Sequence, residues 1–246
     1  MGGCTSANLS GTSSPYRGGV RLVDLNADLG EGVTDDGALL GVVTSANVAC
    51  GYHAGNVATM AAVCEQAAEL GVAIGAQVSY DDRARFGRVA LDVGYDVLRD
   101  QVADQVGTLS AIAVRAGARV TYVKPHGALY HRVLDDDVQA RAVLDGSGEL
   151  AVLTMPGVLA TRAGESGRTV WQEGFPDRAY DDRGRLVDRS EPGAVLDETE
   201  AIVANAVRLA TGVDSLCLHG DTPGAVAHAR AVRTALEGAG WALRHL

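Results

Sequence analysis

The stretch RLVDLNADLGEG, residues 21–32, begins as a short apolar run and ends in acidic and amide side chains. The part from Arg21 to Asn26 predicts a buried strand with functional groups at its carboxyl end. Alternation along a strand points Asp24, Asn26 and Asp28 to one face. Burying several acidic groups is costly unless they meet a cation, a hydrogen-bond donor or a substrate, so we expect this face to line a site. The alternative is a cap and turn that carries acids.

Outward from this stretch, apolar runs ending in polar residues alternate with helical patterns. Further strands are expected at residues 45–50, 72–78, 119–124, 150–154, 168–173 and 215–218, with a short terminal strand at 241–246. Helices are expected at 57–70, 95–116, 137–144, 157–163, 198–210 and 224–238. The inner side of helix 95–116 is expected to carry Val97, Leu98, Val102, Val106, Leu109, Ile112 and Ala113.

About seven strands that mostly alternate with helices predict an α/β fold with a parallel sheet. The sheet either closes into a barrel or stays open and doubly wound. Polar motifs follow at least five strands, and a barrel gathers all its strand ends around one mouth, whereas an open sheet concentrates them at one switch point. We therefore favour a single β/α barrel domain over residues 20–246, preceded by a Gly- and Ser-rich disordered leader at 1–19.

Composition narrows the class of protein. Hydrophobic residues make up 47% of the 246, enough for a sizeable core, and the formal charge is -10. An acidic chain lacks the positive surface that nucleic acid or an anionic membrane would require, and no apolar run approaches the ~18 residues of a membrane span. Cys4, Cys50, Cys64 and Cys217 form no C-x-x-C pair, which favours reduced thiols in a cytoplasmic enzyme.

Four more polar clusters follow predicted strands, and we interpret them as parts of the same site. They are SANVACGYHAGN at 45–56, GAQVSYDD at 75–82 with its continuation to Phe86, Gly87 and Arg88, VKPHGALY at 123–130, and LHGDTPG at 218–224. Glycines on both sides of His53 favour close approach of the backbone to a ligand. Lys124 ends a buried strand, where an unpaired lysine is rare, so a depressed pKa or a carboxylate partner is expected.

The segment after the sixth strand, EGFPDRAYDD at residues 173–182 and on to Arg189, mixes Asp, Arg and Tyr without apolar periodicity. It is typical of a site loop or lid, with a solvated surface loop as the alternative. The sequence has no P-loop, no G-x-G-x-x-G after a strand, no H-E-x-x-H and no G-x-S-x-G. No standard cradle for ATP is therefore present.

Five of these motifs together resemble the LamB/YcsF family, in order, from Val20 to the C-terminus. They are DLNADLGEG (24–32), SANVACGYHAG (45–55), VKPHGALY (123–130), DRAYDDRGRL (177–186) and LCLHGD (216–221). The resemblance implies a seven-stranded β/α barrel similar to the glycoside hydrolase/deacetylase fold. It also implies ATP-dependent opening of a small lactam, 5-oxo-L-proline, to L-glutamate, by the A subunit of a 5-oxoprolinase that works with separate subunits B and C. The subunit that binds ATP stays open.

Roles for individual residues follow from this hypothesis. Phosphorylation of the amide oxygen would make a better electrophile; Asp28, His53 and His126 would then activate water, and Lys124 and Arg178 would hold the carboxylate or phosphoryl charge. The deacetylase-like fold often holds a metal with one Asp and two His, which here implies a divalent metal at Asp28, His53 and His126. The residues expected to bind substrate are Asn26, Asn47, Gln77, Tyr130, Asp177, Arg178, His219 and Asp221.

The chain departs from the family pattern at two places. One is the family motif G-A-H-P-[SG]-[FY]-P-D, where this chain has Gln77 instead of His and has Val78 and Asp81 instead of the two Pro. The other is Asn56, which stands where the family usually has Asp. Glutamine neither shuttles a proton nor binds a metal well. We therefore predict that Gln77 points into the pocket, and that Gln77→His raises ring-opening activity or metal affinity.

Two other functions remain open at this point. One is a metal-dependent deacetylase or amidohydrolase that acts alone, with the metal held by Asp28, His53 and either His126 or His219. The other is a binding or scaffolding subunit without catalysis, which the residues at Gln77 and Asn56 favour. A homo-oligomer is compatible with all three functions.

Overall fold

The structure is a computed structural model that describes residues 16–17, 20–221 and 224–246. Most of the leader expected at 1–19 therefore lies outside the described residues. Within it, Tyr16–Arg17 forms the short strand β1, which pairs antiparallel with the start of β2 (Val20–Leu29).

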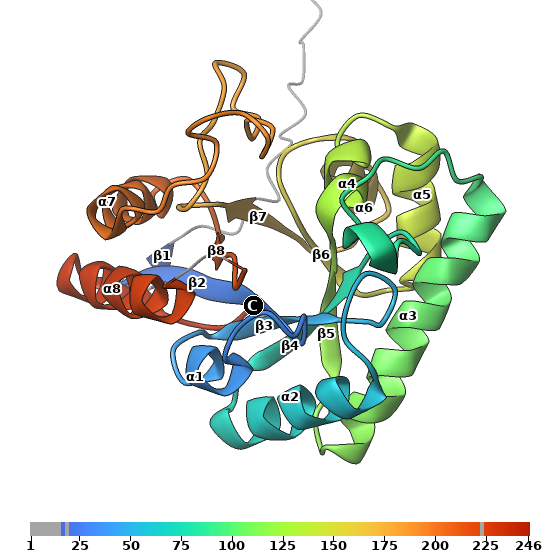
Figure 1. Ribbon diagram of the computed structural model, residues 1–246, viewed down its shortest axis with the longest axis horizontal. Coiled ribbons are helices and arrows are strands. Elements are labelled where there is room, and N and C mark those ends of the chain that lie inside the picture. Colours follow the sequence, from blue (N-terminus) through green and yellow to red (C-terminus); the bar gives the residue numbers. More distant parts are fainter. Residues whose placement is uncertain (1–15, 18–19, 222–223) are drawn as a thin grey trace, which may run out of the picture.

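Seven strands close into a parallel barrel in the described part of the chain (Figure 1). After β2 they are β3 (Ser45–Ala49), β4 (Ala73–Val78), β5 (Val120–Pro125), β6 (Ala151–Thr154), β7 (Val170–Gly174) and β8 (Ser215–Leu218). The last strand returns to the first, so that Asn26 of β2 lies opposite both Ser45 and Cys217. The predicted barrel is confirmed and the open sheet is wrong. Strand β9 (Trp241–Leu243) pairs with the first residues of β2, outside the barrel.

Helices surround the barrel (Figure 1). They are α1 (Asp36–Leu40), α2 (Val57–Leu70), α3 (Tyr95–Arg115), α4 (Gly127–Arg132), α5 (Asp137–Gly146), α6 (Val158–Glu165), α7 (Thr199–Leu209) and α8 (Ala225–Gly238). The sequence did not predict α1, α4 or the 3-10 turn at Arg83–Arg85, because two turns or fewer carry no readable periodicity. Val97, expected on the inner side of α3, is 56% exposed, which corrects that expectation.

The ends of α2 follow from its flanking residues. The Asn56 side chain accepts the Thr59 backbone N–H at 3.0 Å, and Gly71 ends the helix with a φ of 68°. Asn56 is exposed, so it caps a helix and takes no part in the polar barrel interior.

The two faces of the barrel strands have opposite chemistry. In β2, Leu25, Ala27 and Leu29 belong to the main apolar cluster, whereas Asp24, Asn26 and Asp28 are buried polar residues of the alternate positions. The hydrophobic core therefore lies between the sheet and the helices, and the barrel interior is polar. Gly75 of β4 makes room inside, because a Cβ there would lie 2.0 Å from the Tyr122 ring.

Candidate active site at the barrel mouth

The bottom of the barrel interior is occupied by Asp24. Its carboxylate accepts hydrogen bonds from Thr44 Oγ1 at 2.6 Å, from Ser45 Oγ at 2.7 Å and from Ser215 Oγ. Burial raises the pKa of Asp24 to about 6, because desolvation outweighs these hydrogen bonds. Asp24 does not line the cavity at the mouth, so its role is structural.

Above Asp24 a layer of amides is locked by side-chain hydrogen bonds. Asn47 Nδ2 donates to Asn26 Oδ1 at 2.6 Å and to Asp28 Oδ1 at 2.9 Å. The Tyr122 hydroxyl donates to Asn47 Oδ1 at 2.7 Å. Asn26 and Asn47 are both fully buried, so they fix the Asp28 carboxylate from below and do not line the cavity, contrary to the substrate-binding role expected for them.

Lys124 at the end of β5 is a buried cation with two carboxylate partners. Its Nζ lies 3.1 Å from Asp28 Oδ1, 2.9 Å from Glu173 Oε1 and 3.0 Å from Cys217 Sγ. Burial disfavours the ammonium, but Asp28 and Glu173 outweigh it and hold the pKa of Lys124 well above its usual range. Of the two expectations, the carboxylate partner is present and the depressed pKa is wrong.

Asp28 is correspondingly a weak base. Burial alone would raise its pKa, yet Lys124 and the nearby His219 hold the pKa of Asp28 below its usual range. The carboxylate therefore stays charged at neutral pH, bound to Lys124 and Asn47.

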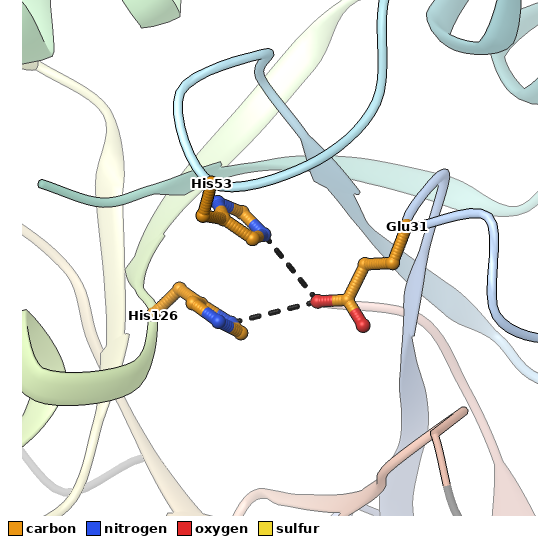
Figure 2. A group of neighbouring side chains, drawn as sticks. All are labelled: Glu31, His53 and His126. Atoms are coloured by element: carbon orange, nitrogen blue, oxygen red, sulfur yellow. Dashed lines mark ion pairs between the residues drawn. The ribbon is translucent and has the colours of Figure 1, made fainter. Parts of the chain in front are cut away.

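Beside this ion pair, Glu31 meets two histidines (Figure 2). Glu31 Oε1 lies 3.4 Å from His53 Nε2 and 3.5 Å from His126 Nδ1. The two imidazole rings are stacked, with centroids 3.9 Å apart and planes 12° apart. Burial raises the pKa of the Glu31 carboxyl group. Burial also lowers the pKa of His126 well below its usual range, so this ring is neutral.

The hydrogen-bond network assigns the protons on both rings. The Ser79 hydroxyl donates to the Tyr80 carbonyl at 2.8 Å, so His53 Nδ1 donates to Ser79 Oγ at 3.0 Å. His53 Nε2 faces Glu31, and this buried atom has no hydrogen-bond partner among the described residues. His126 Nε2 donates to the Phe86 carbonyl at 3.1 Å, which leaves Nδ1 as an acceptor.

The Gln77 side-chain amide donates hydrogen bonds to the cluster of Glu31, His53 and His126. Its Nε2 lies 3.0 Å from Glu31 Oε1 and 2.9 Å from His126 Nδ1, while its Oε1 is buried without a partner among the residues described. The side chain is fully buried and does not line the cavity. The expectation that Gln77 points into the pocket is therefore wrong, because it contacts His126 from behind.

Glu31, His53 and His126 could hold a metal ion by donor type, since one ligand atom from each lies within 4.8 Å of the others. Asp28, expected as a ligand, is not in this group, because Lys124 and Asn47 hold its carboxylate elsewhere. The arrangement does not fit an ion. Imidazole lone pairs lie in the ring plane, so stacked parallel rings cannot both aim at one ion. The Gln77 amide also covers two of the three donors.

A cavity of about 400 Å³ opens at the carboxyl ends of the strands, a size suited to a small ligand. The sequence-predicted residues that line it are Asp28, Lys124, His126, Tyr130, Arg178, His219 and Asp221. The remaining sequence-predicted site residues do not line the cavity; they are Asn26, Asn47, His53, Gln77 and Asp177. Asp177 positions His219, whose Nδ1 lies 2.9 Å from Asp177 Oδ2.

The catalytic and substrate-binding residues expected from the sequence do not include Glu31, Glu173 or Phe86, although each stands in a polar segment that the sequence singled out. Glu31 stands in the turn after β2, off the strand alternation that singled out Asp28. Glu173 lies near the end of β7 beside a predicted loop, and its position at a strand end was the available signal. Phe86 has a φ of 56°, rare outside glycine, and its ring contacts both His53 and His126 edge-on. No sequence pattern indicated this last contact.

The segment between β7 and α7, residues 175–198, forms one wall of the cavity through Arg178, Leu186 and Arg189. Isolated antiparallel bridges, Arg178 with Val195 and Tyr180 with Leu186, hold it in shape. No helix in the described ranges is long and apolar enough to cross a membrane.

Known proteins are similar to this chain over the whole barrel. The model of the LamB/YcsF family matches residues 23–246. A protein of Streptomyces avermitilis, named as the A subunit of 5-oxoprolinase, is 54% identical over 243 residues, which cover 89% of this chain and 97% of that protein. One from Mycobacterium avium with the same name is 50% identical, over 90% of this chain and 98% of the relative.

Among solved structures, the lactam utilization protein from Thermus thermophilus superimposes with a TM-score of 0.85 at 34% identity, over 91% of this chain and 99% of that one. The catalytic domain of a peptidoglycan N-acetylglucosamine deacetylase from Eubacterium rectale gives a TM-score of 0.55 at 13% identity, over 96% of this chain and 93% of that one. The second likeness is one of fold alone.

Proposed function

The chain belongs to the LamB/YcsF family, and from that premise we propose that it is the subunit of a 5-oxoprolinase in which the lactam ring is opened. The observation that carries the proposal is the match to relatives named as the A subunit of 5-oxoprolinase, at 54% identity over 97% of the relative's length. The substrate is 5-oxo-L-proline and the product L-glutamate.

Coupling to ATP belongs to the same proposal, because an unactivated five-membered lactam is stable in water. Transfer of the γ-phosphoryl group of ATP to the amide oxygen gives an activated ring carbon and ADP. One water adds to that carbon, the ring C–N bond breaks with protonation of nitrogen, and a second water releases phosphate from the acyl phosphate. The sequence lacks standard nucleotide motifs, so we assign ATP to the complex with subunits B and C.

Glu31 is our candidate for the acid–base group, in place of Asp28. It lines the cavity, and burial raises its pKa toward the range where a carboxyl group can both accept and return a proton. His126 and His53 flank its Oε1 and hold the carboxyl group in place. Asp28 is unsuited to this role because Lys124 keeps its pKa low.

Lys124 stabilises negative charge at the inner end of the cavity. All three of its N–H bonds already have acceptors, namely Asp28, Glu173 and Cys217. A substrate oxygen would replace the Cys217 sulfur, the weakest of the three acceptors. The ammonium is then held in place before the reaction, which is the arrangement that favours charge developing in a transition state.

Reconstitution with candidate subunits B and C tests the proposal. Glutamate formed from 5-oxoproline is measured with all three subunits, and with this chain, ATP or each partner omitted in turn. We expect glutamate only in the complete mixture. Glutamate formed at the same rate without this chain would contradict the proposal.

A second candidate, a metal-dependent amidohydrolase acting alone, is favoured only by the donor types of Glu31, His53 and His126. Stoichiometric zinc in the purified chain, with hydrolysis of an amide in the absence of ATP, would favour that function. Absence of both leaves the 5-oxoprolinase proposal as it stands.

A further inference from the structure

Arg178 is a buried cation without a carboxylate partner. It is 2% exposed, on the segment between β7 and α7. Its Nε donates to the Ala194 carbonyl at 3.1 Å and its Nη2 to the Val187 carbonyl at 2.6 Å. Among the residues that the structure describes, no Asp or Glu forms an ion pair with Arg178, and its Nη1 makes no hydrogen bond. Both of its hydrogen bonds therefore go to backbone carbonyls, and the nearby carboxylates of Asp177 and Asp221 act on its charge without an ion pair.

The surroundings of Arg178 add positive charge. Arg189, close by, donates to Asp221 at 2.9 Å, and Arg88 shares the same Asp221 carboxylate. Three arginines thus line the cavity, and two of them share the Asp221 carboxylate. The other carboxylates near Arg178 have partners of their own: Asp177 is paired with His219, and the exposed Asp188 is hydrogen-bonded to Ser190. A buried charge is costly unless it is paired, so an anion beside Arg178 would be stabilised.

We propose that Arg178 anchors the carboxylate of a small cyclic amide acid at the outer end of the cavity. This inference rests on the proposed function and specifies how the substrate lies. With the carboxylate on Arg178, the ring amide extends toward Glu31 and Lys124 at the inner end, and all three residues line the same cavity. The apolar groups of Tyr130, Phe175 and Leu186 also line it and suit the ring methylenes.

A guanidinium group binds phosphoryl oxygens as well as carboxylates. We assign the carboxylate because Arg178 offers one positive charge without an ion-pair partner among the described residues, whereas Arg88 and Arg189 are already paired with Asp221. A phosphoryl group, with nearly two negative charges, would require a second free cation.

Calorimetry on the full chain separates the two anions. The ligands are 5-oxoproline, 2-pyrrolidinone, which has the same ring without the carboxylate, and inorganic phosphate. Arg178→Gln is expected to weaken 5-oxoproline binding roughly 10- to 100-fold, the range for hydrogen bonds to charged groups, and to leave 2-pyrrolidinone binding unchanged. The matched control is Arg185→Gln, on the same segment but bonded to Asp135 outside the cavity, with no expected change.

Three results would overturn the inference: equal loss for both lactams, no loss for either, or loss of phosphate binding alone. Arg178 also holds its segment through two carbonyls, so Arg178→Lys, which keeps the charge without the planar fork, serves if the Gln variant unfolds. It should still lose affinity for 5-oxoproline selectively.

Glutamate release by the three-subunit complex keeps the two proposals apart. If the wild-type complex is active and Arg178→Gln leaves KM for 5-oxoproline unchanged, the carboxylate anchor fails and the function stands. If the wild-type complex releases no glutamate, the proposed function itself fails.

Discussion

At the scale of single residues, Gln77 decides what the cluster of Glu31, His53 and His126 can hold. Its amide nitrogen donates to Glu31 and His126, where a bound cation would otherwise attract both groups. An uncharged donor therefore stands in the position of a cation. This explains how the Glu31 carboxyl group and the His126 Nδ1 lone pair can face each other in a buried site.

The variant Gln77→His tests this role. It removes the amide donor and adds a third imidazole, so we expect zinc affinity to rise about tenfold or more, the range by which groups around a metal site alter affinity. Zinc retained after dialysis is the measurement, with Glu69→His on the exposed side of α2 as the control. Equal zinc in Gln77→His and the wild-type chain would show that the position is only a spacer.

The site residues differ in how far sequence could predict them. Asp28, Lys124 and His126 stand at or just after strand ends, and strand ends of a parallel barrel meet at one mouth. Gln77 and Asn47 are on inward strand positions too, yet depth inside the barrel depends on strand stagger, which alternation does not reveal. Glu31 lies in a turn, where no period applies.

At the scale of elements, the turn at residues 83–88 and the start of α4 form a lid over the two histidines. The Phe86 carbonyl binds His126, and the Gly87 carbonyl accepts the Ala128 N–H at 2.9 Å. The two segments approach so closely that a Cβ on Gly127 would lie 2.5 Å from the Gly87 oxygen. The sequence did not predict α4, because six residues are too few for a helical pattern.

Gly127→Ala should therefore destabilise the fold. Gly127 has a φ of 57°, and a left-handed conformation costs an alanine about 1–2 kcal/mol before the contact with Gly87 is counted. We expect a loss of at least about 2 kcal/mol in the free energy of unfolding, measured in urea. Gly107→Ala, on α3 with open space around its Cβ, is the control and should not destabilise. A Gly127→Ala variant as stable as wild type would contradict the close approach.

At the scale of the whole molecule, the barrel places its polar groups inside and its apolar groups under the helices. The alternation of β2 already predicted this division, since Asp24, Asn26 and Asp28 share one face. The number of strands was also readable from the sequence. Closure was favoured because polar motifs follow five strands, but the register of the closing pair, β8 with β2, was not readable because it joins segments far apart in the sequence.

The polar interior makes stability depend on pH through Asp24. The ordinary pKa of this carboxyl group is 3.8 and its pKa in the folded chain is about 6, so the folded state holds the proton more tightly than the unfolded state. The stability contributed by protonated Asp24 is complete below pH 3.8 and is lost as pH rises to about 6. The size of the change is about 3 kcal/mol, because each tenfold difference in proton affinity is worth about 1.4 kcal/mol.

Asp24→Asn removes that titration. As pH rises from about 4 to about 7, the wild type should lose up to about 3 kcal/mol of unfolding free energy relative to the variant. Urea unfolding over this range is the measurement, and Asp81→Asn at an exposed position is the control. A difference that is constant with pH would mean that Asp24 is already charged at the acidic end of the range.

We propose that ring opening takes place at the barrel mouth with Glu31 as the acid–base group. The most direct test is the rate of ATP-dependent glutamate release by the three-subunit complex with Glu31→Gln, against Glu69→Gln, an exposed glutamate on α2. Thermal unfolding first establishes that both variants fold. We predict a fall of roughly a hundredfold or more for Glu31→Gln, the range for a general acid–base group, and a wild-type rate for Glu69→Gln. A folded Glu31→Gln variant that supports the wild-type rate would contradict the account.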